Sequence, residues 1–142
     1  MSPLPGTRVV HPRWSGHHRP TTAGSRTATC TITTGGAGDW SPTTGPTAGT
    51  ATVVHTGTCR VQALNSGANA VDAAGQIVVR RPYLVTIISD APDIPVGARV
   101  RIDTCPNDAR LIGKTLTVAD PKYGSLRFDR DLLCDLDLTN QT

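Results

Sequence analysis

Residues 126–138 read LRFDRDLLCDLDL and hold the clearest strand pattern in the chain. Apolar side chains fill most of the even-numbered positions, and charged side chains, mainly Asp, fill most of the odd-numbered ones. Arg130 and Leu133 interrupt this alternation locally. Because successive side chains of a strand point to opposite faces, the pattern predicts a strand with one buried and one solvated face. The fold class is all-β if the rest of the chain repeats it.

Earlier stretches repeat the alternation, and they span residues 26–33, 51–64, 76–89, 98–103 and 116–118. Pro82 lies in the third of them, and a proline cannot donate a ladder hydrogen bond, so we expect the strand to bend, bulge or lie at a sheet edge there. Residues 106–112 predict one helical turn that ends at Gly113. About six strands with turns between them predict a small antiparallel barrel or sandwich, and we favour the β-barrel.

The composition indicates one modest core. The chain has 142 residues, of which 37% are hydrophobic and 4% aromatic, so burial must rest on Val, Ile, Leu and Ala. It contains no Glu, a favoured helix former, whereas Thr and Val are abundant. No run of about 18 apolar residues occurs, and the first residues lack the basic and apolar regions of a signal peptide. We therefore expect a soluble single domain without a membrane partner, whose small core is supplemented by neighbouring subunits.

The first 25 residues are rich in residues that break regular structure, with four Pro and three Gly. This density predicts an extended N-terminal arm over residues 1–25 without a helix, followed by a β-barrel domain over residues 26–142. Trp14 and Val9 would be costly to leave in water. We therefore expect the arm to lie on its own barrel or on an adjacent subunit, with a disordered tail as the alternative.

A second breaker-rich segment, residues 34–50, reads TGGAGDWSPTTGPTAGT. Gly and Pro at this density predict a long projecting loop with no regular element. A loop of more than about 12 to 15 residues is uncommon in a small domain, and it usually has a function or is disordered. A surface loop without a function is the alternative.

The charge distribution argues against a protein dedicated to binding nucleic acid. Residues 1–71 hold five Arg against one Asp, a balance of +4, and residues 72–142 hold nine Lys or Arg against ten Asp, a balance of −1. The Arg residues are scattered and form no basic stripe. No phosphate-binding loop, nucleophile elbow or zincin motif occurs. We predict no catalytic, cofactor-binding or metal-binding residue, and no enzyme.

The four Cys stand at positions 30, 59, 105 and 134. No two of them lie within four positions of each other, which argues against a structural zinc site. Three fall on the apolar face of a predicted strand, so we expect buried thiols, and a disulfide between Cys30 and Cys59 stays an alternative. A nucleophile pair of His55 and Cys59 would need an exposed thiol. His17 and His18 point to opposite sides of an extended chain, so they predict no metal site.

Asp129 and Asp131 lie two residues apart on one strand face, as do Asp135 and Asp137. Such pairs can form acid–base or metal sites, but among neighbouring Arg residues we interpret them as a solvated outer face. Two classes of function remain. One is an assembly protein whose arm and loop make interfaces, and the other is a small barrel that binds a polymer such as single-stranded nucleic acid or glycan. The second class needs aromatic side chains on a concave sheet face.

The order of five segments resembles a family of small actinobacteriophage proteins, the head-to-tail stoppers of the head-tail connector. The segments are Gly57–Gln62, Gln76–Tyr83, Ile94–Val100, Leu111–Val118 and Arg127–Cys134. The late GKTLTV at residues 113–118, followed by RDLLC at residues 130–134, is the most persuasive part. The resemblance covers residues 26–138, and the N-terminal arm departs from it.

The resemblance implies a structural protein of the virion neck, made in the host cytoplasm and assembled as a homo-oligomeric ring of twelve copies. A stopper docks below the portal and adaptor, closes the channel on packaged double-stranded DNA without sequence specificity, and presents a docking surface to the tail terminator or tail proteins. An adaptor or tail terminator is the alternative within this class.

In such proteins a long loop between two early strands acts as the channel plug. We assign that role, as a hypothesis, to Gly36, Gly38, Asp39, Trp40, Thr43 and Thr44. Our candidates for intersubunit contacts of the arm are Val9, Trp14, His17 and His18.

Overall fold

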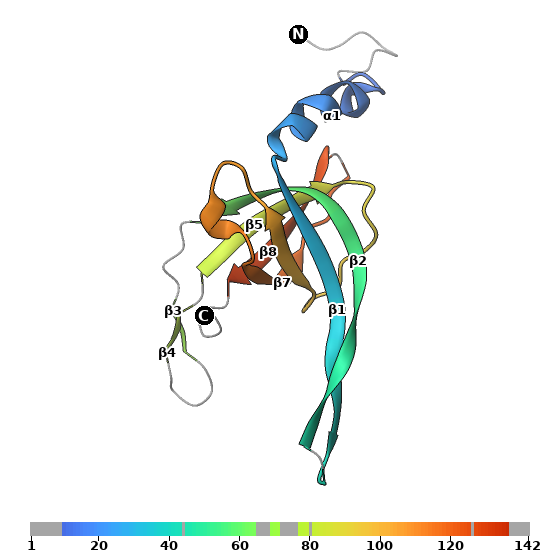
Figure 1. Ribbon diagram of the computed structural model, residues 1–142. Helices are drawn as coiled ribbons and strands as arrows, with labels where there is room; N and C mark the ends of the chain where they lie inside the picture. The colour runs from blue at the N-terminus through green and yellow to red at the C-terminus, as the bar shows by residue number, and fades with distance from the viewer. Residues whose placement is uncertain are drawn as a thin grey trace.

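The computed structural model describes residues 10–43, 45–64, 69–71, 77–79, 81–125 and 127–136. Within them, one helix, α1 (Trp14–Ser25), precedes eight strands (Figure 1). The strands are β1 (Ala28–Ser41), β2 (Gly45–Ala63), β3 (Asn69–Val71), β4 (Ile77–Val79), β5 (Arg81–Ile88), β6 (Arg99–Thr104), β7 (Thr115–Pro121) and β8 (Asp129–Leu136). A 3₁₀ turn, η1 (Ala109–Leu111), lies between β6 and β7.

Six strands form a closed antiparallel barrel in the order β1-β2-β5-β8-β7-β6, with β6 pairing back onto β1. The predicted all-β fold and small six-stranded barrel are therefore confirmed. Because β6 pairs with β1, the sheet has no first or last strand whose edge is left unpaired along the closed part. The expected turn over residues 106–112 is η1, and Gly113 follows it with a φ of 81°, a conformation that suits glycine.

The core is the interior of this barrel, and the inward positions are those that the alternation predicts. In β8, Leu132, Cys134 and Leu136 are buried, whereas the residues between them are half-buried. The other strands contribute a set of side chains that are at most 1% exposed, namely Cys30, Ile32, Cys59, Val85, Ile87, Val100, Ile102, Leu116 and Val118. These are aliphatic residues and thiols, so the barrel is filled without large aromatic rings.

The stretch predicted as one strand over residues 76–89 is two strands in different sheets. β4 pairs with β3 in a separate two-stranded sheet, and β5 begins at Arg81 within the barrel. The prediction of one long strand is therefore wrong, and Pro82 lies within β5, whose pairing with β8 runs through Pro82 without a register shift. The short strand β3 lies between the stretches predicted as strands over residues 51–64 and 76–89.

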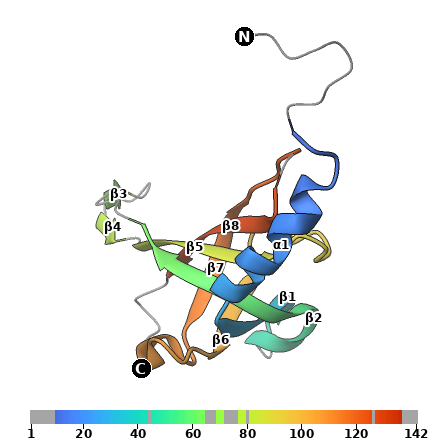
Figure 2. The same ribbon diagram turned by 90° about the horizontal axis from the view of Figure 1, so that it is seen from above.

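The prediction that residues 1–25 contain no helix is wrong for residues 14–25, which form α1. Pro20 lies inside the helix, where it cannot donate a backbone hydrogen bond. The density of Gly and Pro does not predict the local structure here, because contacts with the barrel, described below, hold the helix in place. α1 lies at the end of the barrel opposite the hairpin tip (Figures 1 and 2). Residues 1–9 are outside the described residues.

The prediction that residues 34–50 contain no regular element is also wrong. β1 and β2 continue past the barrel as a long two-stranded hairpin (Figure 1). Gly35 and Gly36 adopt positive φ values of 78° and 91° where the register shifts between Gly35 and Ala37. These glycines therefore form a β-bulge instead of ending the strand. The predicted projection from the barrel remains, but its backbone is paired.

Candidate functional site

The junction between α1 and the barrel begins with an aromatic cluster. The Trp14 ring lies 4.7 Å from the Phe128 ring, centroid to centroid, and 4.9 Å from the His18 ring. Phe128 immediately precedes β8. Stacked and tilted rings at these distances stabilise a contact beyond the area that they bury. Trp14, predicted to lie on the barrel or on another subunit, lies on its own barrel.

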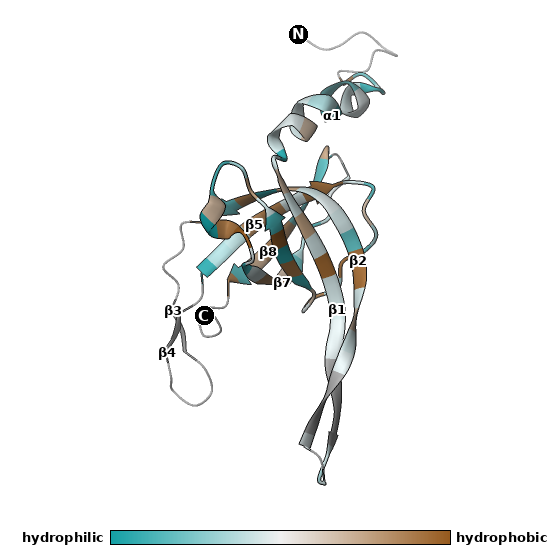
Figure 3. Cartoon of the chain, viewed as in Figure 1, coloured by the Kyte–Doolittle hydropathy of each residue, from teal (hydrophilic) through white to brown (hydrophobic). Residues whose placement is uncertain are grey.

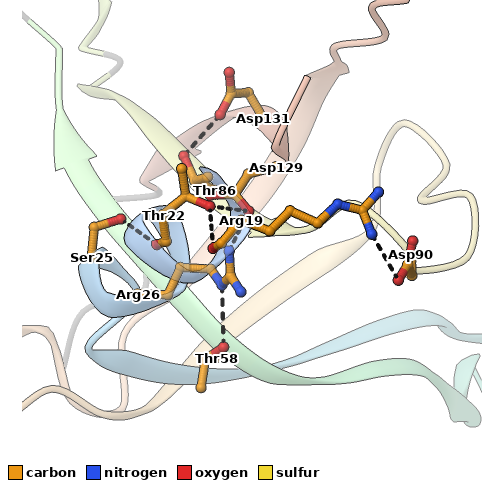
Figure 4. A network of polar contacts seen from close by, with 9 residues as sticks. All are labelled: Arg19, Thr22, Ser25, Arg26, Thr58, Thr86, Asp90, Asp129 and Asp131. Carbon is orange, nitrogen blue, oxygen red and sulfur yellow. Dashed lines mark hydrogen bonds and ion pairs between the residues drawn. The ribbon is translucent and has the colours of Figure 1, made fainter. Parts of the chain in front are cut away.

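An ion pair between Arg26 and Asp129 fastens the C-terminal end of α1 (Figure 4). Only 7% of the Arg26 side chain and 11% of the Asp129 side chain are exposed. Arg26 Nε also donates to Thr58 Oγ1 at 3.3 Å, and Thr22 Oγ1 donates to Asp129 Oδ1 at 3.5 Å. The helix end is therefore linked to both β2 and β8, in surroundings where breaking the pair would be costly.

A second polar contact within the junction is exposed and weaker. Arg19 reaches Asp90 at 3.8 Å, with about half or more of each side chain in solvent (Figure 4). Exposed pairs of this kind contribute little to stability. The near-buried pair at Arg26, and not this one, therefore positions the helix.

Asp131 lies on the same outer face of β8 and is also engaged. It accepts a hydrogen bond from Thr86 Oγ1 at 2.8 Å and pairs with Arg127 at 2.6 Å. The sequence interpretation of Asp129 and Asp131 as a solvated face is thus wrong for Asp129, since α1 covers it. Spacing within β8 could not reveal this, because the partner Arg26 is 103 positions away.

Arg130, which breaks the alternation in β8, has a structural role of its own. Its Nη1 donates to the carbonyl oxygens of Ala91 and Pro92 at 2.6 and 2.7 Å, and its Nη2 donates to the carbonyl oxygen of Ser89 at 3.2 Å. The guanidinium therefore ties the turn after β5 to β8.

Two open cavities lie on either side of Phe128 and Asp129. One, of about 290 Å³, is lined by residues of α1 and by Ile88 and Asp90. The other, of about 380 Å³, is lined by Arg60, Thr86, Arg127 and Asp131, among others. The helix–barrel junction thus combines fixed charges with space that a partner group can enter.

The projecting hairpin carries the residues that we assigned to the channel plug. Gly36, Gly38, Asp39 and Trp40 belong to β1, and Trp40 pairs with Pro46, next to the final pair of Ser41 with Gly45. The backbone thus brings Asp39 and Trp40 close to the tip. Thr43 lies in the turn. Thr44 and the side chains of residues 37–40 are outside the described part of the chain.

The proposed arm contacts are only partly described. His17 and His18 are exposed on α1, and His18 also contacts the Trp14 and Phe128 rings. Val9 is outside the described residues. Figure 3 shows the brown, hydrophobic residues concentrated in the barrel strands, whereas most of the described projecting hairpin is pale.

The cysteines are free and buried, as predicted. A hydrogen bond with Cys59, and then burial, raise the pKa of Cys30 far above its ordinary value. Burial raises the pKa of Cys134 to about 12. Cys59 is fully buried, so it lacks the solvent access that a nucleophile paired with His55 would need.

Among the residues that the structure describes, no three His, Cys or Asp side chains are grouped so that they could hold a metal ion. Likewise, no described helix has the length and apolar character needed to cross a bilayer.

The fold and the junction define a small closed β-barrel protein with a projecting hairpin and a docked N-terminal helix. Residues 18–135 match the family of unknown function DUF6093, and the chain belongs to that family. The solution structure of protein SF1141 from Shigella flexneri 2a is similar, with a TM-score of 0.52 and 21% sequence identity. The similarity covers 80% of this chain and 96% of that one, and at this identity it concerns the fold alone. Nothing among the curated proteins matches the chain.

Proposed function

We propose that this protein is a head-to-tail stopper, a ring-forming subunit of a phage neck that closes the portal channel after DNA packaging and provides the docking surface for the tail. The observation that carries the proposal is the β1–β2 hairpin, which projects from a closed barrel. This shape agrees with what the sequence resemblance implies for a channel plug.

The hairpin is independent of the barrel ladder. The last pair of β1 with β6 is Thr33 with Arg99, and the first pair of β2 with β5 is Cys59 with Ile87. Between these positions the described parts of the two strands pair only with each other. Val54 still packs against the core, so the part of the hairpin that can move without disturbing the core begins beyond the pair of Thr33 with Val53. Such a movement suits a gate that opens and closes.

The charge of the hairpin also suits a channel. Asp39 is the only charged residue between positions 34 and 54. Proteins that hold DNA tightly neutralise many phosphates with Lys and Arg. A nearly uncharged hairpin can block the path of DNA without binding it, so that the DNA leaves freely when the gate opens.

Surface residues support assembly into a ring. Several large apolar side chains are exposed in the single chain, including Val53 at 59%, Val96 at 67% and Tyr123 at 63%. Contacts between identical subunits that close by rotation generate rings. In a ring, such side chains would be buried against neighbouring subunits, the portal or adaptor above and the tail proteins below. This burial would increase the stability of a subunit whose own core is small.

Two aromatic rings that a polymer-binding barrel could use for stacking are already engaged within the chain. Tyr83 packs against the core and Trp14 packs against Phe128. Neither ring is free to stack on a base or a sugar, as a binding barrel would require.

The test replaces residues 36–50 with the two-residue turn Asn-Gly, which joins the paired residues Gly35 and Ala51. In a phage that carries this gene, we expect the variant to form the ring and the neck, but the packaged heads should lose their DNA. Electron microscopy of the particles and a nuclease assay of the DNA measure this outcome.

The matched control is Asp39→Asn, which keeps the length of the hairpin and should retain the DNA. Circular dichroism of the purified variants establishes that the barrel is intact. If the shortened variant keeps full heads, the hairpin is not the plug. If mass spectrometry of purified necks does not find the wild-type chain, the stopper proposal itself is wrong.

A further inference from the structure

The larger cavity at the helix–barrel junction contains an arginine whose surroundings are unusual. Arg60 lies in a cross-strand row in which it pairs with Thr86, and Thr86 pairs with Asp131. The cavity beside this row has a volume of about 380 Å³ and is also lined by Arg127 and by Thr22 of α1. It therefore lies between the outer face of the barrel and the helix.

The Nε–H of Arg60 is buried, and no described residue accepts a hydrogen bond from it. Buried donors nearly always have an acceptor, because an unpaired one loses its hydration without compensation. A guanidinium cannot relieve this by losing its proton, since it stays charged in proteins. Arg60 thus places a positive charge beside the cavity, and its buried Nε–H has no acceptor among the described residues.

The acidic groups that line the same cavity already have hydrogen-bond and ion-pair partners. Asp129 pairs with Arg26 on the helix side. Asp131 accepts from Thr86 at 2.8 Å and pairs with Arg127 at 2.6 Å. Each carboxylate has its own guanidinium, Arg26 from outside the cavity for Asp129 and Arg127 for Asp131, so Arg60 has no carboxylate partner among the described residues.

We propose that this cavity is a docking pocket for an acidic side chain, Asp or Glu, of a partner protein. A single carboxylate matches the charge of Arg60, and its two oxygens fit the planar donors of a guanidinium. A doubly charged phosphate, or the backbone of a nucleic acid, would bring excess negative charge next to Asp129 and Asp131. The two carboxylates in the wall thus favour a monoanionic partner group.

The position of the pocket couples docking to α1. Phe128 lines the cavity and also contacts Trp14, and Thr22 contributes a helix residue to the wall. A carboxylate on Arg60 would therefore alter the surroundings of the Trp14 ring. This pocket is separate from the hairpin, so the proposal does not depend on the plug.

The experiment follows the ¹H–¹⁵N signal of Arg60 Nε by NMR in the full chain. The probes are N-acetyl-Gly-Asp-Gly-amide, sodium acetate and inorganic phosphate, each titrated at constant ionic strength against sodium chloride. We expect the Asp peptide and acetate to shift this signal, and phosphate to shift it less. Trp14 fluorescence in a Trp40→Phe background should change over the same range of peptide concentration.

The variant Arg60→Gln should weaken binding of the Asp peptide by about tenfold or more, since a hydrogen bond to a charged group is lost. Arg99→Gln is the matched control, because Arg99 is exposed on β6 and its replacement removes the same charge. It should leave the affinity unchanged.

Three results would overturn the proposal: no shift of the Arg60 signal beyond the chloride control, tighter binding of phosphate than of carboxylate, or equal loss of affinity in both variants. The titration of the wild-type chain decides the matter even if Arg60→Gln does not fold.

Discussion

The β1–β2 hairpin carries the β-branched residues Ile32 and Val53 in different surroundings. At the barrel end, Ile32 and Cys59 are fully buried, because β6 and β5 pair with the outer sides of the two strands and close the wall. Where the hairpin leaves the barrel, Val53 is 59% exposed, and beyond it the register of the two strands shifts at bulges. A β-branched residue favours a strand in both places. Only closure of the barrel turns that local preference into burial.

The largest difference between the two ends should appear when a side chain is truncated. Ile32→Ala should lower the free energy of unfolding by about 4 kcal/mol, because it leaves a cavity in a core that has few large side chains. Val53→Ala on the projecting hairpin should change it by about 0.5 kcal/mol or less. Urea denaturation followed by circular dichroism measures both. Equal losses would mean that the hairpin belongs to the folding core.

A substitution at the helix junction should lower the free energy of unfolding by an amount between these two values. Asp129→Ala removes the partner of the nearly buried Arg26 and should cost about 3 kcal/mol, because a charge is left buried and unpaired. The matched control is Asp90→Ala, which breaks the exposed pair with Arg19 and should cost ~0.5 kcal/mol.

The measurement is urea denaturation, with Trp14 fluorescence in a Trp40→Phe background as a reporter of α1. We expect Asp129→Ala to release Trp14 from Phe128 before the barrel unfolds. If the two Asp variants behave alike, the ion pair does not position the helix.

The smallest effect concerns His55, which pairs with Ile32 where the register of the hairpin first shifts. Burial, and then the nearby positive charge of Arg130, lower the pKa of His55 below its ordinary value of 6.5. As the pH falls, the unfolded chain therefore takes up a proton at this residue before the folded chain does. The contribution of His55 to stability should be constant above about pH 7.5 and decrease as the pH falls through 6.5.

The midpoint of urea unfolding, measured between pH 7.5 and 5, tests this dependence. In His55→Gln the decrease should be smaller than in the wild type, whereas His17→Gln, at an exposed position on α1, should keep the wild-type decrease. An unchanged decrease in His55→Gln would show that another group is responsible.

Residue patterns predicted the barrel wall well but failed at both appendages. Alternation identified Leu132, Cys134 and Leu136 as buried, since a strand that faces a closed core must be apolar at every second position. The same approach missed α1 and the paired backbone of residues 34–41. Gly and Pro lower local preference for regular structure, but they do not forbid it where contacts or bulges compensate.

The candidate pocket could not be predicted from spacing at all. Arg60 follows the strand period of β2, and nothing in its neighbourhood along the chain marks it as different. Its unpaired Nε results from how β2, β8 and α1 meet, and the acids near it are engaged by Arg26 and Arg127. A sequence pattern records which face a residue occupies, but not which charges remain unpaired there.

The sequence by itself determined the class of the fold, the inward residues of the barrel and the presence of segments outside the barrel, which the structure describes as α1 and the projecting hairpin. Those properties follow from the period of two along a strand and from composition, which are local. Only the tertiary structure decided that residues 14–25 are helical, that the hairpin is paired, and that Arg26 and Asp129 share a nearly buried site. The helix and the ion pair depend on contacts between residues far apart in the chain, which form only when the barrel closes. The pairing of the hairpin depends on a bulge at Gly35 and Gly36 that the residue pattern does not reveal.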